Sequence, residues 1–389
     1  MRGLLCLART AVVSLVMVPA LLAPTLARAA IPPPPSDPKA PIRLVSFAAP
    51  PVSVTCAGGP VALLEGAGPP PKLWQVWMPP VGQASAPPYT PPPPPTAEVY
   101  GFSIDAGGHP ADLKRKTVSN GLGIWNSEEH AAILASWRFP AGAAAKDCSV
   151  DLAPSYIPLA EASPARLFEA LAADPRNAPP MLRKAVAADG DCVGAERRRP
   201  KTMSYPDTRP FDDKTVDPAW AGLTFDIDAG GATRNVRVVA QHGAPAFTKA
   251  VTSAVAKGRY FPGPARTRCY IVFKAMPKAT DAPKREGPPA VDEETCKITR
   301  EQLNLPENKF FPPAYARQRV GGRALLRFDV APWGQIGAVE VLESQPTAAF
   351  GDAARMLLGI ARPKAAGVGH HGCVVPIIYA IPPSGEQEP

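Results

Sequence analysis

ALLRFDVAPWGQIGAVEVLES, residues 324–344, is the most regular stretch of the sequence. From Leu326 to Val330, apolar and charged side chains alternate, which is the period-two pattern of a half-buried strand. The turn signal Pro332-Trp333-Gly334 follows, and residues 336–342 then predict a second strand. The stretch therefore predicts a β-hairpin.

A helix and a third strand complete the unit. Counting from Phe350, apolar residues recur at i+3, i+4, i+7, i+8 and i+11, which predicts an amphipathic helix that ends at Pro363. Residues 373–381, CVVPIIYAI, are rich in β-branched side chains and predict the closing strand. A short helix is also expected around Pro313–Arg319. Together these elements predict an α+β module with a β-β-α-β core, in which a three-stranded antiparallel sheet packs with one or two helices.

The module is present three times. Its copies are marked by three pairs of cysteines: Cys56 and Cys148, Cys192 and Cys269, and Cys296 and Cys373. The last two spacings are both 77 residues, and the first is 92 because the proline run Pro91–Pro95 is inserted. Such a period predicts a tandem repeat. The expected divisions are a signal peptide (1–29), a Pro-rich N-terminal segment (30–50), module 1 (51–158), a helical linker (159–188), module 2 (189–280) and module 3 (281–389). In module 1, Glu128 and Glu129 fall where the helix stripe should be apolar, so we expect a weaker core there.

The N-terminus has the features of an export signal. Arg2 supplies a positive charge, Ala11–Leu22 is an apolar core, and Ala27-Arg28-Ala29 fits a cleavage site for signal peptidase. The alternative is a retained inner-membrane anchor formed by residues 11–27, which is at the short limit for a membrane-spanning helix. We expect a mature, periplasmic chain that begins after residue 29.

Export makes the cysteines interpretable. Of the seven cysteines, Cys6 leaves with the signal, and an oxidising compartment favours disulfides among the other six. Many pairings are possible in principle, but the repeat favours one disulfide within each module. Metal binding is the weaker alternative because the chain has no close C-x-x-C spacing.

No pattern in the sequence indicates catalysis or a cofactor. His370-His371-Gly372-Cys373 is the one local cluster of ligand-type side chains, and we expect it to be an exposed loop before a strand. Glu128-Glu129-His130 lacks the second histidine of a zinc-protease motif, and no G-x-S-x-G, P-loop or dinucleotide fingerprint is present. We therefore expect no catalytic residues, no metal and no cofactor.

The formal net charge is +8, with short basic runs at Lys114-Arg115-Lys116 and at 197–201. These runs are expected to be solvated loops, with attraction to an anionic envelope surface as the alternative. Nucleic acid is excluded as a partner because exported proteins rarely meet it. The sequence indicates no oligomeric state.

Residues 311–380 resemble the C-terminal domain of the TonB family of energy transducers. The residues that carry the resemblance are Phe311-Pro312-Pro313-Ala314-Tyr315-Ala316-Arg317, Gly321, Leu326-x-Phe328-Asp329-Val330, Gly334, Val339-x-Val341-Leu342-x-Ser344-x-Pro346, Phe350 and Val375-Pro376-Ile377-Ile378-Tyr379. Module 2 matches more loosely, and module 1 mainly by analogy with the other two. The chain departs from the transducer pattern in having three such modules, paired cysteines in each, and no long Pro-Glu/Pro-Lys spacer.

The resemblance implies that the last strand of a module captures a short peptide of an outer-membrane transporter by strand addition, in which main-chain hydrogen bonds supply affinity. In this sequence the implied partner-binding edge is Val374, Val375, Pro376, Ile377, Ile378 and Tyr379. The leading hypothesis is a non-enzymatic periplasmic protein that binds protein or peptide partners. The alternatives are an inner-membrane-anchored transducer, an envelope-binding structural protein, and a closing strand with no ligand.

Overall fold

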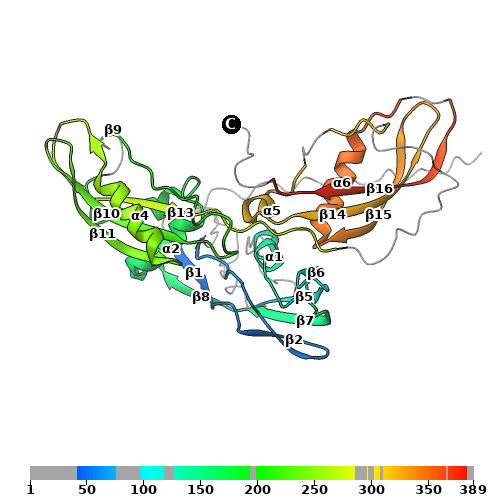
Figure 1. The fold of residues 1–389 in the computed structure, drawn as a ribbon, viewed down its shortest axis with the longest axis horizontal. Coiled ribbons are helices and arrows are strands. Elements are labelled where there is room, and N and C mark those ends of the chain that lie inside the picture. The colour runs from blue at the N-terminus through cyan, green and yellow to red at the C-terminus, as the bar shows by residue number, and fades with distance from the viewer. Residues whose placement is uncertain are drawn as a thin grey trace, which may run out of the picture.

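The computed structural model describes residues 42–75, 97–117, 127–192, 199–284, 296, 302–306, 310–364 and 367–382. The predicted signal peptide and the run Pro91–Pro95 lie outside these residues. The fold is of the α+β class, as the sequence predicts, and consists of several small antiparallel sheets packed with helices. Modules 2 and 3 lie at opposite ends of the molecule, and module 1 lies between them along one side (Figure 1).

Modules 2 and 3 both have the predicted β-β-α-β order. Their elements are β10 (Trp220–Ile227), β11 (Thr233–His242), α4 (Pro245–Ala256) and β13 (Arg266–Lys274) in module 2, and β14 (Gly322–Val330), β15 (Ile336–Gln345), α6 (Ala348–Ile360) and β16 (His370–Tyr379) in module 3. The sheet orders are β11-β10-β13 and β15-β14-β16, so the first strand is central in each. The predicted short helix is present as α5 (Pro313–Gln318).

Alternation in β14 builds the core of module 3. Leu326 and Phe328 are buried beneath α6, and the aromatic ring of Phe350 is fully buried beside them. Gly322 makes room for that ring, because a Cβ at this position would lie 2.3 Å from the ring's Cδ1 atom. Burying each large apolar side chain of this kind stabilises the fold by roughly 1.5–3 kcal/mol.

Module 1 differs from the prediction, because its sheet has five strands and not three. Its elements are β2 (Ser53–Cys56), β3 (Gly59–Ala62), β5 (Glu98–Ile104), β6 (Pro110–Arg115), α1 (Ser127–Ala135) and β7 (Ala145–Leu152). The sheet order is β3-β2-β7-β5-β6, so a β2–β3 hairpin is added beyond the closing strand β7. The hairpin turns at Ala57-Gly58, and Gly59 at the start of β3 has a φ of 113°, which L side chains rarely adopt.

The last part of the Pro-rich N-terminal segment, residues 30–50, contains a strand that the sequence did not indicate. The strand β1 (Ile42–Phe47) is central in a separate sheet of order β4-β1-β8, and Leu44 and Val45 are fully buried. The other strands of this sheet are β4 (Lys72–Gln75) and β8 (Pro154–Pro158). The expected module 1 range therefore contributes two strands to a sheet that the sequence did not indicate.

The range 159–188, predicted to be a helical linker, contains η1 (Leu159–Glu161), α2 (Pro164–Ala173) and α3 (Pro180–Val186). Helix α2 packs on the face of the module 2 sheet that α4 does not cover. Phe168 makes the contact, and the centroid of its ring lies 6.4 Å from that of the Tyr270 ring. Gly222 leaves room for this ring, because a Cβ at position 222 would lie 2.2 Å from the Cδ1 atom of Phe168. Two strands, β9 (Pro200–Thr202) and β12 (Arg259–Tyr260), pair beside this sheet. The sheet of module 2 is thus enclosed by helices on both faces.

Modules 1 and 3 share one hydrophobic core. Helix α1 packs against α5, and β6 meets the end of β15. At that contact the Asp112 amide donates to Gln345 Oε1 (2.9 Å) and the Leu113 amide donates to the Pro346 carbonyl (2.8 Å). The two modules are therefore packed as one unit.

Candidate partner-binding edge

The residues predicted to bind a partner lie in β16, at one edge of the module 3 sheet. Among the strands that the structure describes, β16 pairs with β14 alone. Val375, Ile377 and Tyr379 are buried in the core, whereas Pro376 and Ile378 point to the opposite, exposed face, and Ile378 is 58% exposed. Within the described residues, the strand thus presents one backbone edge that pairs with no other strand and one row of accessible side chains.

Pro376 determines which backbone groups point outward from this edge. It lies opposite Leu325 of β14, and because proline has no amide hydrogen this pair cannot exchange two hydrogen bonds. Hydrogen-bonded and non-hydrogen-bonded pairs alternate in an antiparallel ladder, so Val375 and Ile377 bond to β14 while Val374 and Ile378 direct their amides outward. The open edge therefore offers two amide donors, with a gap at Pro376.

Three disulfides are present, and they join the pairs that the repeat favours: Cys56–Cys148, Cys192–Cys269 and Cys296–Cys373. Cys373 is buried in β16, opposite Phe328 of β14. The Cys296–Cys373 disulfide therefore ties β16 to the chain at the residue just before the predicted edge. A loop of this length stabilises the module by roughly 4 kcal/mol in the chain-entropy model.

In module 1 the equivalent edge is already occupied. The closing strand β7 corresponds to β16, and β2 pairs with it in the antiparallel direction, with Thr55 opposite Ser149. Ser149 follows Cys148 as Val374 follows Cys373. The apolar side chain of Val54 is buried by this pairing. The chain itself therefore places an added strand on the closing strand of one of its modules.

Module 2 shows a partial version of the same contact. The Asp191 amide donates to the Thr267 carbonyl (3.3 Å), and Asp191 Oδ1 accepts from the Thr267 amide (2.6 Å). Asp191 directly precedes Cys192, whose disulfide partner is in β13. The chain before the cysteine thus contacts the beginning of the closing strand and not its full length.

The exposed face beside β16 has paired charges. Arg323 and Arg327 of β14 form ion pairs with Glu343 (2.6 Å) and Glu340 (3.3 Å) of β15. Asp329 accepts a hydrogen bond from the Gly372 amide (2.8 Å), and this bond, together with His371, holds the pKa of the Asp329 carboxyl below its usual range. This face consequently offers little unpaired charge to a partner.

The His370-His371 cluster is part of β16 and not the exposed loop that we expected. His371 Nδ1 lies 3.3 Å from Asp329 Oδ2. No group of three or more histidine, cysteine or acidic side chains that could hold a metal occurs in the described ranges.

Glu128 and Glu129 of α1 join modules 1 and 3. The Tyr315 hydroxyl donates to Glu128 (3.2 Å), and Glu129 forms ion pairs with Arg317 (3.0 Å) and Lys72. These acidic residues interrupt the expected apolar stripe because they contact α5 and β4. Packing between modules 1 and 3 therefore explains why acidic residues replace apolar ones in this helix. The sequence pattern of one module alone does not reveal such packing.

Hydrogen-bonded polar side chains surround the buried carboxylate of Glu98. The Glu98 carboxylate accepts from the Tyr100 hydroxyl (2.9 Å) and Arg115 (3.2 Å), and it lies 3.0 Å from Nδ1 of the fully buried His130. Burial raises the pKa of Glu98, but the bonds with His130 and Tyr100 outweigh burial and hold the pKa below its usual value. Sequence patterns did not reveal this cluster.

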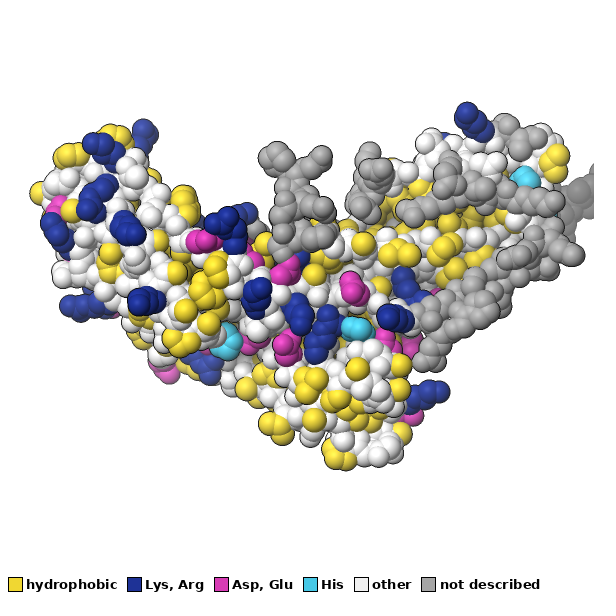
Figure 2. Space-filling view, in the orientation of Figure 1, with side chains coloured by type: hydrophobic (Ala, Val, Ile, Leu, Met, Phe, Trp, Pro, Cys, Tyr) yellow, Lys and Arg dark blue, Asp and Glu magenta, His cyan; other side chains and the backbone are white. Residues whose placement is uncertain are grey.

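Basic side chains gather at the end of the molecule that module 2 forms (Figure 2). Three arginines of module 2 are ion-paired: Arg209 with Asp207, Arg234 with Asp228, and Arg268 with Asp189. The pairing lowers the charge available to an anionic surface. Part of the predicted basic run at 197–201 lies outside the described residues.

A scan against protein-family models and a search of curated proteins find no match to the chain. None of the described helices is long and apolar enough to cross a membrane. The predicted alternative anchor, residues 11–27, lies outside the described part.

Proposed function

We propose that this chain is a periplasmic, non-enzymatic binding protein whose third module captures an extended protein or peptide segment by strand addition to β16. The observation that carries the proposal is the pairing of β2 with β7 in module 1. It supports strand addition because the same repeat accepts an antiparallel strand at the corresponding position. Main-chain hydrogen bonds supply affinity in this mode, and pockets for alternate side chains supply selectivity.

The edge of β16 that pairs with no described strand defines what the partner must supply. Carbonyl groups of the partner would accept from the outward amides of Val374 and Ile378, and no bond from an amide is available at Pro376. Ile377 and Tyr379 of β16 point into the core of module 3. On the same face of the sheet, a partner strand would therefore place an apolar side chain beside this core. On the resemblance to the TonB family, we propose a segment of an outer-membrane transporter as the partner.

The proposal is tested with peptides selected from a displayed random library against the mature, oxidised protein. Selected peptides should slow hydrogen exchange at Val374 and Ile378. Exchange at Val375 and Ile377 should change little, because their amides already bond to β14. Protection confined to other strands would refute the proposal.

Two variants at position 378 distinguish the contribution of the backbone amide to binding from that of the side chain. Ile378→Pro removes an outward amide, and Ile378→Thr keeps the amide while removing part of the apolar surface. Losing one hydrogen bond costs about 1 kcal/mol, so we expect the proline variant to bind roughly five-fold to ten-fold more weakly. The threonine variant should bind more tightly than the proline variant.

The alternatives predict different results. An envelope-binding protein would lose affinity steeply as salt concentration rises, whereas strand addition would depend weakly on salt. For an anchored transducer, mass spectrometry would find a mature chain that retains residues 11–27. We propose a cleaved periplasmic chain, for which the N-terminus should be Ala30 or Ile31.

A further inference from the structure

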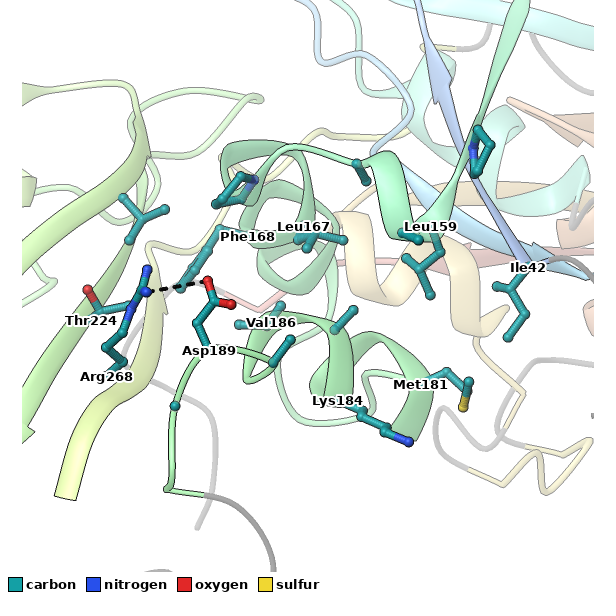
Figure 3. A pocket seen from close by; sticks show the side chains of 18 residues that line it. Ile42, Leu159, Leu167, Phe168, Met181, Lys184, Val186, Asp189, Thr224 and Arg268 are labelled. Carbon is teal, nitrogen blue, oxygen red and sulfur yellow. Dashed lines mark ion pairs between the residues drawn. The ribbon is translucent and has the colours of Figure 1, made fainter.

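A groove with a volume of about 700 Å³ lies between the linker helices and module 2 (Figure 3). It is separate from β16, and its lining comes from several distant parts of the chain. These are represented by Ile42 of β1, Leu159 of η1, Leu167 of α2, Val186 of α3 and Thr224 of β10. The volume lies in the usual range of small-molecule sites, which are mostly apolar and contain a few polar groups.

The shape and chemistry of the groove suit an aliphatic chain. Figure 3 shows its lining extending from Thr224 and Arg268 at one side to Ile42 and Leu159 at the other. The lining is mainly aliphatic, and Phe168 is its one aromatic side chain. When a flexible alkyl chain binds along such a surface, each methylene that leaves water makes binding more favourable.

The charges on the lining favour one negative charge on the ligand. Three charged side chains line the groove, and two of them, Arg268 and Asp189, pair with each other (3.4 Å). The third, Lys184 of α3, has no ion pair or hydrogen bond within the described ranges. One positive charge is therefore left unmatched beside an aliphatic surface.

We propose that this groove binds a fatty acid, with the alkyl chain along α2 and α3 and the carboxylate near Lys184. The inference goes beyond the proposed function, because it concerns a small-molecule site on the linker and not the edge of β16. A ligand in this position would contact the N-terminal sheet, the linker helices and module 2 together.

The test is calorimetric titration of the mature protein with octanoate, decanoate and dodecanoate below their micelle concentrations. Each added methylene should tighten binding about four-fold, which corresponds to about 0.8 kcal/mol. Dodecanol, which has the same chain and no charge, should bind more weakly. An affinity that does not change with chain length would overturn the proposal.

Two variants locate the ligand. Ala160→Trp places a large side chain in the groove at an exposed position, so it should abolish dodecanoate binding without unfolding the protein. Lys184→Met should weaken dodecanoate binding and leave dodecanol binding unchanged. Lys257→Met, at the end of α4 and outside the groove, is the matched control and should bind dodecanoate like the wild type. Unchanged dodecanoate binding by both groove variants would also overturn the proposal.

Discussion

Replacing Gly222 by valine should separate α2 from the sheet of module 2. The Cβ of residue 222 would lie 2.2 Å from Cδ1 of Phe168, where an unstrained carbon–carbon contact is about 3.5–4.0 Å. The ring must therefore move by more than about 1 Å. Such overpacking costs about 1–3 kcal/mol.

Valine also brings a gain that partly offsets this cost. It is favoured in strands, and replacing glycine removes freedom from the unfolded chain, together worth about 0.5–1 kcal/mol. The middle values of the cost and the gain leave a net loss of about 1 kcal/mol, or roughly 4–8 °C in the unfolding temperature of module 2. Differential scanning calorimetry measures this shift, and hydrogen exchange in β10 localises it.

Two further variants test the cause. Gly337→Val, in β15, meets no atom within 4 Å of the new Cβ, so it should not lower the unfolding temperature of module 3. Adding Phe168→Ala to Gly222→Val should cost less than the sum of the two single changes, because the clash is then removed. If the double variant lost as much stability as the sum of the two single changes, the packing of Phe168 on Gly222 would be refuted.

Three other predictions concern charges and disulfides. Glu98→Ala should lower the free energy of unfolding by about 1–3 kcal/mol near neutral pH, because the buried side chains of Tyr100 and His130 lose their hydrogen bonds to this carboxylate. The folded-state pKa of Glu98 is lowered, so its contribution to the free energy of unfolding is complete above the unfolded pKa of about 4.3. This contribution is lost as pH falls through the folded-state pKa. Urea unfolding at several pH values measures the loss. The pairing of His242 with Asp217 (3.0 Å) raises the pKa of the histidine, so its contribution is complete below the unfolded pKa of about 6.5 and disappears as pH rises through the folded value. Because the pair is exposed, His242→Gln should cost less than about 1 kcal/mol at pH 5 and nothing at pH 9. The double variant Cys296→Ser/Cys373→Ser should lose about 4 kcal/mol in thermal unfolding of module 3, and equal stability would contradict a structural role for this disulfide.

The sequence predicts the elements whose patterns are local. The hairpin of β14 and β15, helix α6 and the short helix α5 follow from alternation, an apolar stripe and proline positions. The cysteine spacing predicts the disulfides because it recurs with the repeat. These signals lie within one module and need no knowledge of its neighbours.

The remaining features depend on contacts between distant segments. Strand β2 has only four residues, too few for a distinct periodic signal, and its position on β7 is a tertiary property. Nothing in the sequence near Gly222 indicates that the ring of Phe168 packs on it. Glu98 and His130 are 32 residues apart, and polar side chains of these types are usually exposed, so nothing local indicates their burial.

The added strand on β7 also limits how these chains can assemble. A protein with several copies of one adhesive edge can join its neighbours head to tail, and such contacts grow into open filaments when they do not close. In module 1 that edge is filled by the chain's own hairpin, and the Cys56–Cys148 disulfide holds the hairpin in place. An incoming strand therefore cannot pair with β7, and the edge of the sheet on this side is the short strand β3. Under the proposed function, this protection allows the chain to bind a partner at β16 without pairing through the closing strand of every copy.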